Sequence, residues 1–341
     1  MRGTELEITN RFETKSYSAF DDGWDIAEEL PVIQTQFFND HAKSILFKND
    51  SPDVGMDYSI NVYRGCEHGC AYCRARPYHE YLGFNAGIDF ETKIMVKHDA
   101  PELLRKTFDS KKWQPQCVMM SGNTDCYQPA DRKYQLTRKV LEVFLEYRNP
   151  VSILTKNALI LRDLDILKEL ASMNLTSTLI SITSLDPDLR RKLEPRTSTA
   201  KMKYKAMEEL AKADIPVGVM VGPIIPGLND NEVPNILKQA SDNGATYCTH
   251  TILRLPFAIK PIFVDWLNKN VPEKSERVLK RVEMIRGGRL NDSKWGTRMT
   301  GTGAYADFMH TIFHKLAIKH GLNKMRRPLR TDLFRRPGEL F

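Results

Sequence analysis

The sequence predicts an α/β protein in which parallel strands alternate with helices, closing either into a barrel or into an open doubly wound sheet. Short apolar, β-branched runs recur between residues 58 and 254, and amphipathic stretches separate them. A chain of 341 residues is also long enough for one large domain with extensions. In both architectures ligands bind at the carboxyl ends of the strands, so functional residues are expected there.

The expected elements follow one another as repeated strand–helix units. The six strands are expected at residues 58–63, 116–121, 151–155, 178–183, 217–221 and 247–253. The helices between them are expected at residues 101–108, 132–147, 164–173, 201–213 and 232–243. Asp186 and Pro187 predict one more short helix, because the aspartate can cap it and the proline fixes φ at its first position.

Both ends of the chain differ from this alternating core. The first 57 residues lack clear periodicity, whereas the last part is mostly helical, at residues 263–270, 273–285 and 305–320. We therefore expect an irregular N-terminal extension at residues 1–57, a core at 58–255 and a helical, basic C-terminal extension at 256–341.

Composition favours a folded cytoplasmic protein. Hydrophobic residues make up 41% and charged residues 27% of the chain, which is ordinary for a soluble protein. The first 20 residues lack the apolar centre of a secretory signal. The most apolar stretch, residues 216–227, is interrupted by Pro223 and Pro226 and is too short to span a membrane. The cysteines are accordingly expected to be reduced thiols.

Positive charge is concentrated near the C-terminus. The net charge is +7, and residues 271–341 hold 16 Lys and Arg against 7 Asp and Glu. The basic residues include Lys324, Arg326, Arg327, Arg330, Arg335 and Arg336. Such a segment suits binding to phosphates, but a solvated surface would have the same composition, so charge alone leaves both interpretations open.

Three of the six cysteines lie close together in one loop. Cys66, Cys70 and Cys73 follow the first expected strand directly, whereas the other three are scattered and are expected to serve in packing. Three thiolates at this spacing can hold a four-iron cluster and leave one iron open. The alternative is a zinc site completed by His68 or His79. Zinc sites usually show two pairs of ligands, and no second pair follows.

Further motifs accompany the cysteine loop. They are Ser51-Pro-Asp53, Asp89-Phe-Glu-Thr-Lys93, Gly122-Asn-Thr-Asp125, Tyr127-Gln-Pro129, Glu194-Pro-Arg-Thr197 and Trp295-Gly-Thr-Arg-Met299. With the cysteine spacing, these motifs resemble the spore photoproduct lyase-related group of the radical S-adenosylmethionine (SAM) superfamily, over about residues 40–255. The resemblance implies a partial (β/α)6 barrel of the TIM type, a [4Fe-4S] cluster on the three cysteines, and SAM bound at the open iron. It also implies reductive cleavage of SAM to a 5′-deoxyadenosyl radical, and an electron donor of the flavodoxin or ferredoxin type.

The resemblance assigns the SAM-binding residues to several loops and strands. Tyr72 is expected near the adenine, and the turn formed by Ser121, Gly122, Asn123, Thr124 and Asp125 is expected to receive the amino group. An ordinary turn stabilised by the Asn and Asp side chains would have the same sequence. Ser181 and Thr183 are expected near the ribose, Arg196 at the carboxylate and Gly222 beside the adenine. Core packing, or pairing of Arg196 with Glu194, is the alternative for these positions.

At two positions the residues differ from those of the spore photoproduct lyase-related group. Relatives commonly carry a tyrosine after the third cysteine, where this chain has Arg74. Spore photoproduct lyase uses a cysteine in the second-strand loop as a hydrogen-atom donor; Cys126 is the nearest candidate here, and a buried structural thiol is the alternative.

Three functional hypotheses follow. The chain could act by radical chemistry on nucleic acid or a nucleotide, or by the same chemistry on a protein or small metabolite. A non-catalytic zinc module that binds nucleic acid is the third. The oligomeric state is left open.

Overall fold

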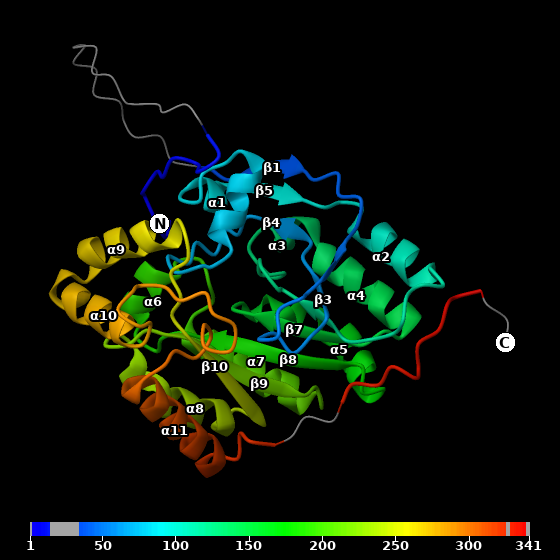
Figure 1. Cartoon of the computed structure of the whole chain (residues 1–341). Coiled ribbons are helices and arrows are strands. Elements are labelled where there is room, and N and C mark those ends of the chain that lie inside the picture. Colours follow the sequence, from blue (N-terminus) through cyan, green and yellow to red (C-terminus); the bar gives the residue numbers. More distant parts are fainter. Residues whose placement is uncertain (1, 14–33, 325–327, 339–341) are drawn as a thin grey trace.

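A computed structural model describes residues 2–13, 34–324 and 328–338 of the chain. The described part contains one large sheet flanked by helices and one small sheet beside its upper end (Figure 1). The large sheet has seven strands in the order β10-β9-β8-β7-β6-β3-β2. Its strands are β2 (Leu46–Lys48), β3 (Tyr58–Ile60), β6 (Val118–Met120), β7 (Val151–Thr155), β8 (Thr176–Ile182), β9 (Val217–Ile224) and β10 (Tyr247–Ile252).

The order of the strands separates the two architectures that the sequence left open. From β3 to β10 every neighbouring pair in this sheet is parallel, and the strands of the sheet lie in the order in which they occur along the chain. A doubly wound sheet reverses its strand order at a switch point, whereas right-handed crossovers in one direction put all helices on one face. The expected (β/α)6 arrangement of the TIM type is therefore confirmed as a partial, open barrel.

Helices cover the outer face of this barrel (Figure 1). The helices of the core are α2 (Ala100–Asp109), α3 (Asp131–Tyr134), α4 (Leu136–Tyr147), η2 (Ala158–Asp163), α5 (Leu164–Ser172), α6 (Pro187–Leu193), α7 (Ala200–Lys212), η3 (Asp230–Glu232) and α8 (Val233–Asp242). The expected helix at residues 132–147 is divided at Gln135, whose φ of +52° interrupts helical geometry. Asp186 caps α6 by accepting from the backbone of Asp188 and Leu189, as expected.

The expected first strand, residues 58–63, is divided between the two sheets. After β3 the chain leaves the large sheet and forms β4 (Tyr63–Arg64), which pairs with β5 (Lys93–Val96). The N-terminal segment adds β1 (Gln36–Asn39) to the other side of β5, and β2 to the edge of the barrel sheet. These strands of two to four residues are too short to show periodicity in the sequence. The small sheet supports the cysteine loop.

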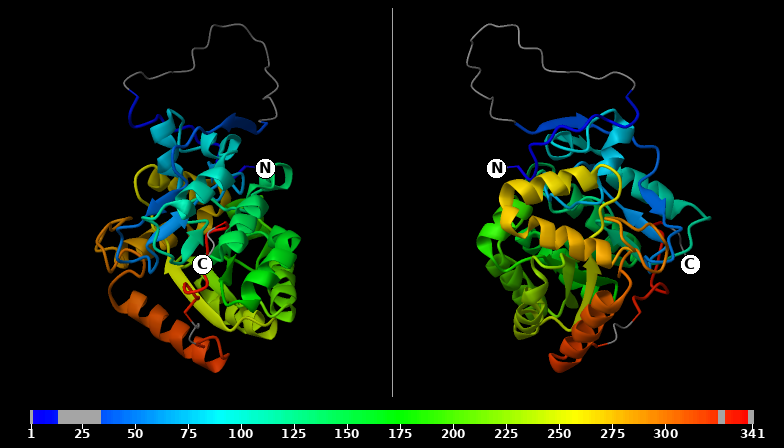
Figure 2. Two further views of the ribbon diagram at one scale, coloured as in Figure 1. Left: turned by 90° about the vertical axis from the view of Figure 1, so that its right-hand side faces the viewer. Right: turned by 60° about the vertical axis from the view of Figure 1, so that its left-hand side comes forward.

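The remaining helices lie around the cysteine loop and the last strand. They are η1 (Arg76–Leu82), α1 (Asp89–Thr92), α9 (Ile259–Asn270), α10 (Pro272–Met284) and α11 (Ala304–Lys319). Figure 2 shows α9 and α10 stacked beside the end of the barrel, with α11 below them. None of the described helices is long and apolar enough to cross a bilayer.

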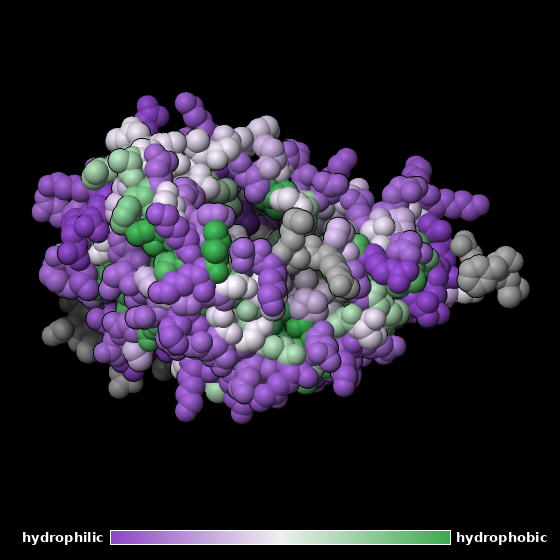
Figure 3. Space-filling view, turned by 90° about the horizontal axis from the view of Figure 1, so that it is seen from below, coloured by the Kyte–Doolittle hydropathy of each residue, from purple (hydrophilic) through white to green (hydrophobic). Residues whose placement is uncertain are grey.

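The hydrophobic core fills the space between the large sheet and its outer helices. Val118, Val151, Ile180 and Val219 from four neighbouring strands are fully buried in it. The opposite face of the sheet carries buried polar residues at the strand ends, among them Ser181 and Thr183. Seen from below, the surface is mostly hydrophilic, with hydrophobic residues scattered across it and a hollow (Figure 3). Polar residues inside the barrel mark the face on which a ligand can be held.

Candidate functional site

The cysteine loop begins where β4 ends, at the carboxyl end of the barrel. Cys66 is fixed by its backbone N–H, which donates to Phe90 O at 2.8 Å. Gly69 has a φ of +66°, and a Cβ at this position would lie 2.6 Å from Glu91 Oε2. Glycine is therefore required here both by the backbone conformation and by the close approach of Glu91.

A buried ion pair holds the loop from below. Arg76 Nη2 lies 2.5 Å from Glu91 Oε1, and both side chains are inaccessible to solvent. Arg76 also donates from Nε to Cys70 O at 2.9 Å, and Glu91 accepts from the backbone of Gly3 and Thr4. These bonds tie the loop to the N-terminal segment, so the position of the cysteines depends on residues far away in the sequence.

The three thiols lie within electrostatic reach of one another. Burial raises the pKa of Cys66, and the negative charges of Asp125, Cys73 and Cys70 raise it further. Burial also raises the pKa of Cys70, with Glu194 and Cys73 adding to the shift and Lys156 opposing it. None of the described cysteines is in a disulfide. Among the described residues, no three His, Cys, Asp or Glu side chains are placed to hold a single metal ion.

The donor set suits a cluster with several irons. In a four-iron cluster each thiolate binds a different iron, so the sulfurs need to be neighbours without converging on one point. Thiolates this close repel one another, and a metal centre supplies the positive charge that stabilises them together. Neither of the two histidines considered for zinc joins the cysteines in a group that could hold a metal ion among the described residues: His68 Nδ1 lies 3.5 Å from Asp125 Oδ2, and the His79 ring packs against Phe84 and Phe90.

The turn after β6 is fixed by Asn61, which follows β3, and by Tyr63, the first residue of β4. Asn61 Oδ1 accepts from the backbone of Asn123 at 2.8 Å and of Thr124 at 3.3 Å. The Thr124 hydroxyl donates to Tyr63 O at 2.8 Å. Ser121 has a φ of +73°, and its Oγ accepts from the backbone of Cys126 at 2.9 Å. The predicted turn is thus a rigid structure held between two strands.

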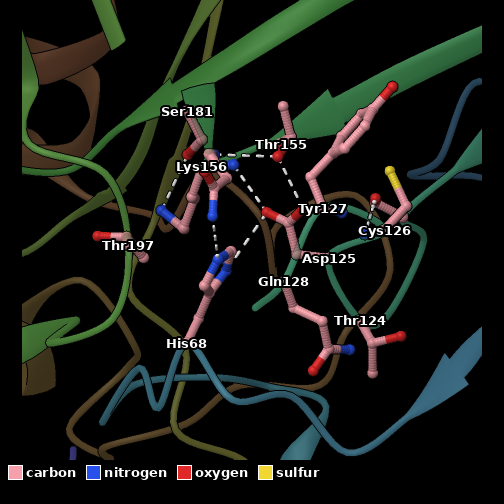
Figure 4. Close-up of polar contacts among 12 residues, drawn as sticks. His68, Thr124, Asp125, Cys126, Tyr127, Gln128, Thr155, Lys156, Ser181 and Thr197 are labelled. Atoms are coloured by element: carbon pink, nitrogen blue, oxygen red, sulfur yellow. Dashed lines mark hydrogen bonds and ion pairs between the residues drawn. The ribbon is translucent and has the colours of Figure 1, made fainter. Parts of the chain in front are cut away.

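Asp125 connects this turn to the next strand (Figure 4). Its carboxylate accepts from Thr155 Oγ1 and from the backbone N–H of Lys156, both at 2.7 Å. It also faces His68, whose second ring nitrogen lies 3.3 Å from Asn157 Nδ2. Burial lowers the pKa of His68, with the Asp125 charge opposing the shift. The Asp125 carboxylate is thus occupied by its hydrogen bonds with Thr155 and Lys156 and by its contact with His68.

Lys156 brings several of the predicted SAM-binding residues together. Its Nζ donates to Ser181 Oγ at 3.0 Å, Thr183 Oγ1 at 2.9 Å and Gly222 O at 3.1 Å. The same Nζ lies 5.5 Å from the centre of the Tyr72 ring. The residues expected at the adenine and the ribose thus surround one ammonium group.

Glu194 neutralises this ammonium group. Its Oε2 lies 3.2 Å from Lys156 Nζ, and its Oε1 lies 2.9 Å from Lys203 Nζ. The Tyr72 phenol donates to Glu194 Oε2 at 2.5 Å, and the Thr183 hydroxyl lies 3.0 Å from that oxygen. Although burial alone would raise the pKa of Glu194, Lys156 and Lys203 lower it well below its usual range. Burial lowers the pKa of Lys156, but the charges of Glu194, Cys70 and Asp125 reverse this shift and raise it.

Arg196 lies apart from this network. Its Nη1 lies 2.8 Å from Glu67 Oε1, and its backbone N–H donates to His68 O at 3.4 Å. Glu194 and Arg196 are therefore each paired with other partners and not with each other. Both belong to the segment between α6 and α7, which joins the cysteine loop to the barrel.

Cys126 is buried in the hydrophobic core, with 2% of its surface exposed. Burial raises the pKa of its thiol, and the charge of Asp125 adds to the shift. Figure 4 shows its sulfur on the far side of the turn from Lys156 and His68. Its carbonyl accepts from the Thr137 hydroxyl at 2.6 Å, which ties the turn to α4.

Sequence reasoning missed Lys156 as a site residue. Its position was the available signal, because it follows β7 directly and so lies at the carboxyl end of a barrel strand. Asn61 and Lys203 were also missed. Asn61 follows β3, but Lys203 lies inside α7, where a lysine normally faces solvent.

The chain belongs to the radical SAM superfamily. The sequence model described as "Radical SAM superfamily" matches residues 60–240, which is more than half of the chain. This match confirms the class of enzyme that the cysteine loop and its associated motifs predict.

Two similar proteins support the same grouping. An uncharacterized protein of Mycobacterium tuberculosis is 36% identical over 218 residues, which cover 63% of this chain and 64% of that protein. An uncharacterized protein of Methanocaldococcus jannaschii is 30% identical over 184 residues, covering 54% and 66% respectively. The matched segment thus spans about two thirds or less of each relative.

The fold is similar to that of spore photoproduct lyase. A structure of that enzyme complexed with dinucleoside spore photoproduct has a TM-score of 0.60 and 16% identity, over 83% of this chain and 79% of that chain. A variant of it with bound AdoMet and dinucleoside spore photoproduct has a TM-score of 0.56 and 17% identity, over 80% and 76%. At this level of identity the similarity establishes the fold.

Proposed function

We propose that this protein holds a [4Fe-4S] cluster through Cys66, Cys70 and Cys73 and cleaves SAM reductively. The observation that carries the proposal is the arrangement of the cysteine loop beside the network of Lys156, Glu194 and Tyr72. Both lie at the carboxyl end of the barrel, where three buried or half-buried thiols are close neighbours. When bound and reduced, the cluster supplies the electron that splits the sulfonium into methionine and a 5′-deoxyadenosyl radical.

The residues around Lys156 would bind and orient SAM. Ser181 and Thr183 offer hydroxyls for the ribose, Tyr72 offers a ring face for the adenine, and the Gly222 carbonyl offers an acceptor. Lys156 places a positive charge among these groups, and its electrostatic contact with Cys70 also stabilises a thiolate. We assign Lys156 to the carboxylate of SAM, because its Nζ lies among Ser181, Thr183 and Gly222, whereas Arg196 lies apart from these residues on Glu67.

The turn after β6 would receive the amino group of SAM. Bonds to Asn61 and Tyr63 hold Asn123 and Thr124 in a fixed conformation, and the Ser121 hydroxyl is bonded to the backbone of Cys126. A carbonyl held in place in this way accepts from an ammonium without having to reorganise.

The substrate that we favour is a nucleic acid or nucleotide. The structures of spore photoproduct lyase with a dinucleoside photoproduct motivate this choice, and so does the basic C-terminal segment. Of the basic residues named in that segment, Arg326 and Arg327 lie outside the described residues. A protein or small-metabolite substrate is the second candidate. A low-potential flavodoxin or ferredoxin would supply the electron.

An anaerobic assay tests the chemistry. Protein reconstituted with iron and sulfide is mixed with dithionite and SAM, and 5′-deoxyadenosine is measured by chromatography. We expect release by the wild-type protein and none by Cys70→Ala, whereas Cys248→Ala should match the wild type because its thiol lies on β10, outside the cysteine loop. Equal release by Cys70→Ala would refute the assignment of the cluster.

A further inference from the structure

Two motifs that the proposed chemistry does not use, residues 51–53 and 295–299, lie against each other. Asp53 Oδ1 accepts from the backbone of Gly296 at 2.6 Å across a separation of 243 residues in the sequence. Arg298 donates to the carboxylate of Asp53 and to the hydroxyl of Ser51. We call this arrangement the clasp. It fixes Arg298 at the surface of the barrel.

The clasp is joined to the end of β10. The backbone N–H of Ile252 donates to Met299 O at 3.0 Å, and Arg254 Nη1 lies 3.3 Å from Met299 Sδ. The buried guanidinium of Arg286 binds both sides of this junction. Its four acceptors are the carbonyls of Thr297, Arg298, Ile252 and Leu253, at 2.8 to 3.2 Å. Arg254 is thereby held between the clasp and the last strand of the barrel.

Around Arg254, positive charge exceeds negative charge. Burial lowers the pKa of Arg254 to about 10, and repulsion from Arg298, Arg74 and Arg286 contributes to the shift. Asp53 and Asp292 are the carboxylates whose charges act on Arg254 and Arg286. Arg298, Arg74 and Arg286 therefore all lie near enough to act on Arg254, and Asp53, which opposes them, is itself paired with Arg298.

Arg254 has donors left over. Among the described residues its buried Nε has no hydrogen-bond partner, and no carboxylate lies within ion-pair distance of its guanidinium. The thioether of Met299 is only a weak acceptor. A buried donor without a partner destabilises the protein, and an anion would satisfy it.

This group of arginines borders the proposed active site. Arg74 directly follows Cys73, a proposed ligand of the [4Fe-4S] cluster. Arg74 is exposed and donates to Gly122 O, in the turn after β6, at 2.8 Å. An arginine fork matches the oxygens of a phosphate.

We propose that Arg74, Arg254 and Arg298 form a binding subsite for a phosphate group of the substrate, beside the cysteine loop. The subsite rests on the proposed function in one respect: the phosphate belongs to the molecule on which the radical acts. The clasp holds Arg298 in place, and the end of β10 holds Arg254. Arg74 provides the exposed donor.

The test measures binding of an oligothymidylate of about eight nucleotides, a length within the usual site sizes for single strands. The reconstituted anaerobic protein is titrated against the fluorescein-labelled oligomer at several salt concentrations. Loss of one phosphate contact makes the fall of log K with log salt less steep by about 0.7. The affinity at 0.1 M salt therefore decreases by about fivefold. We expect this change for both Arg74→Gln and Arg254→Gln.

Arg105→Gln is the matched control, because Arg105 forms an exposed ion pair with Glu146 on the outer helices. It should keep the wild-type slope. Arg254→Lys, which retains the charge, should recover part of the lost affinity, and the exposed Arg74 can be changed without disturbing the fold. Wild-type slopes in both Arg74→Gln and Arg254→Gln would overturn the proposal.

A competition experiment identifies the anion. Inorganic phosphate should displace the oligomer from the wild-type protein more effectively than acetate at equal ionic strength, and equal displacement would overturn the assignment to phosphate. Binding needs no reductant and no SAM cleavage. Protein that releases 5′-deoxyadenosine but shows no arginine-dependent binding would refute the subsite alone, whereas protein that binds but releases none would refute the proposed chemistry alone.

Discussion

The phenol of Tyr72 donates a 2.5 Å hydrogen bond to Glu194 Oε2, and this bond joins the cysteine loop to the barrel. Tyr72 lies between Cys70 and Cys73, and Glu194 follows α6. The same carboxylate binds Lys156 and Lys203. The loop that would hold the cluster and the residues that would hold SAM are therefore parts of one buried polar network.

Replacing Glu194 with glutamine should destabilise the fold strongly. The change removes the carboxylate that pairs with the buried Lys203 and with the partly exposed Lys156, so we expect the free energy of unfolding to fall by about 3–5 kcal/mol. Denaturant unfolding measures it. Glu208→Gln, which removes an exposed ion pair with Lys212, should cost far less, because solvent screens that pair. Equal costs for the two variants would contradict the buried network.

The same carboxylate predicts a pH dependence of stability. The pKa of Glu194 is lower in the folded protein than its ordinary value of 4.5. Its contribution is therefore fully present above pH 4.5 and is lost as the pH falls from there toward the folded-state pKa. The gap in unfolding free energy between the wild type and Glu194→Gln should narrow below pH 4.5. A gap that is constant with pH would be inconsistent with an ionised Glu194.

Lys156→Met should weaken SAM binding. Removing a charged hydrogen bond of about 1.5–3 kcal/mol lowers affinity by about 10- to 100-fold. Equilibrium dialysis with labelled SAM measures the loss. Lys168→Met, an exposed position on α5, is the control. Unchanged SAM affinity in a folded Lys156→Met protein would remove Lys156 from the binding site.

Gly69→Ala should impair incorporation of the cluster. Its Cβ would lie 2.6 Å from Glu91 Oε2, so the cysteine loop has to move. Gly83→Ala is a matched control, because Gly83 also has a positive φ but has no atom within 4 Å of the added Cβ. We expect about 1 kcal/mol of destabilisation and normal iron content for Gly83→Ala. Full iron content in Gly69→Ala would contradict this account of the loop.

Cys126 should be protected from alkylation in the native apoprotein. Because its thiol is buried in the core, iodoacetamide should modify it about a hundredfold more slowly than the half-buried Cys73. Mass spectrometry of timed samples measures both rates. Equally fast modification of Cys126 would show that its thiol reaches the solvent-connected site, as a hydrogen-atom donor requires.

The sequence predicted the parts of the fold that depend on local patterns. The strand at residues 151–155 has the bounds that its apolar run predicts, and Asp186 with Pro187 marked the start of α6. Apolar runs and helix caps could be recognised because they depend only on residues close together in the sequence. β4 and β5 could not be found in this way, because two to four residues do not establish a period.

The candidate site was only partly predictable, for a different reason. Tyr72, Ser181, Thr183 and Gly222 were expected in the site, and the structure brings them together around Lys156. The position of Lys156 after β7 was an available signal, but its contacts could not be inferred, because a long lysine side chain reaches neighbours on other strands that the sequence does not pair with it. The clasp between Asp53 and Arg298 joins residues 245 positions apart, which no local pattern reveals.

Electron paramagnetic resonance of the reduced, reconstituted protein tests the central claim most directly. We predict the signal of a [4Fe-4S] cluster that changes when SAM is added, because the fourth iron is open to the cofactor. Absence of a cluster signal in protein that has been loaded with iron and sulfide, or a signal that SAM leaves unchanged, would contradict it.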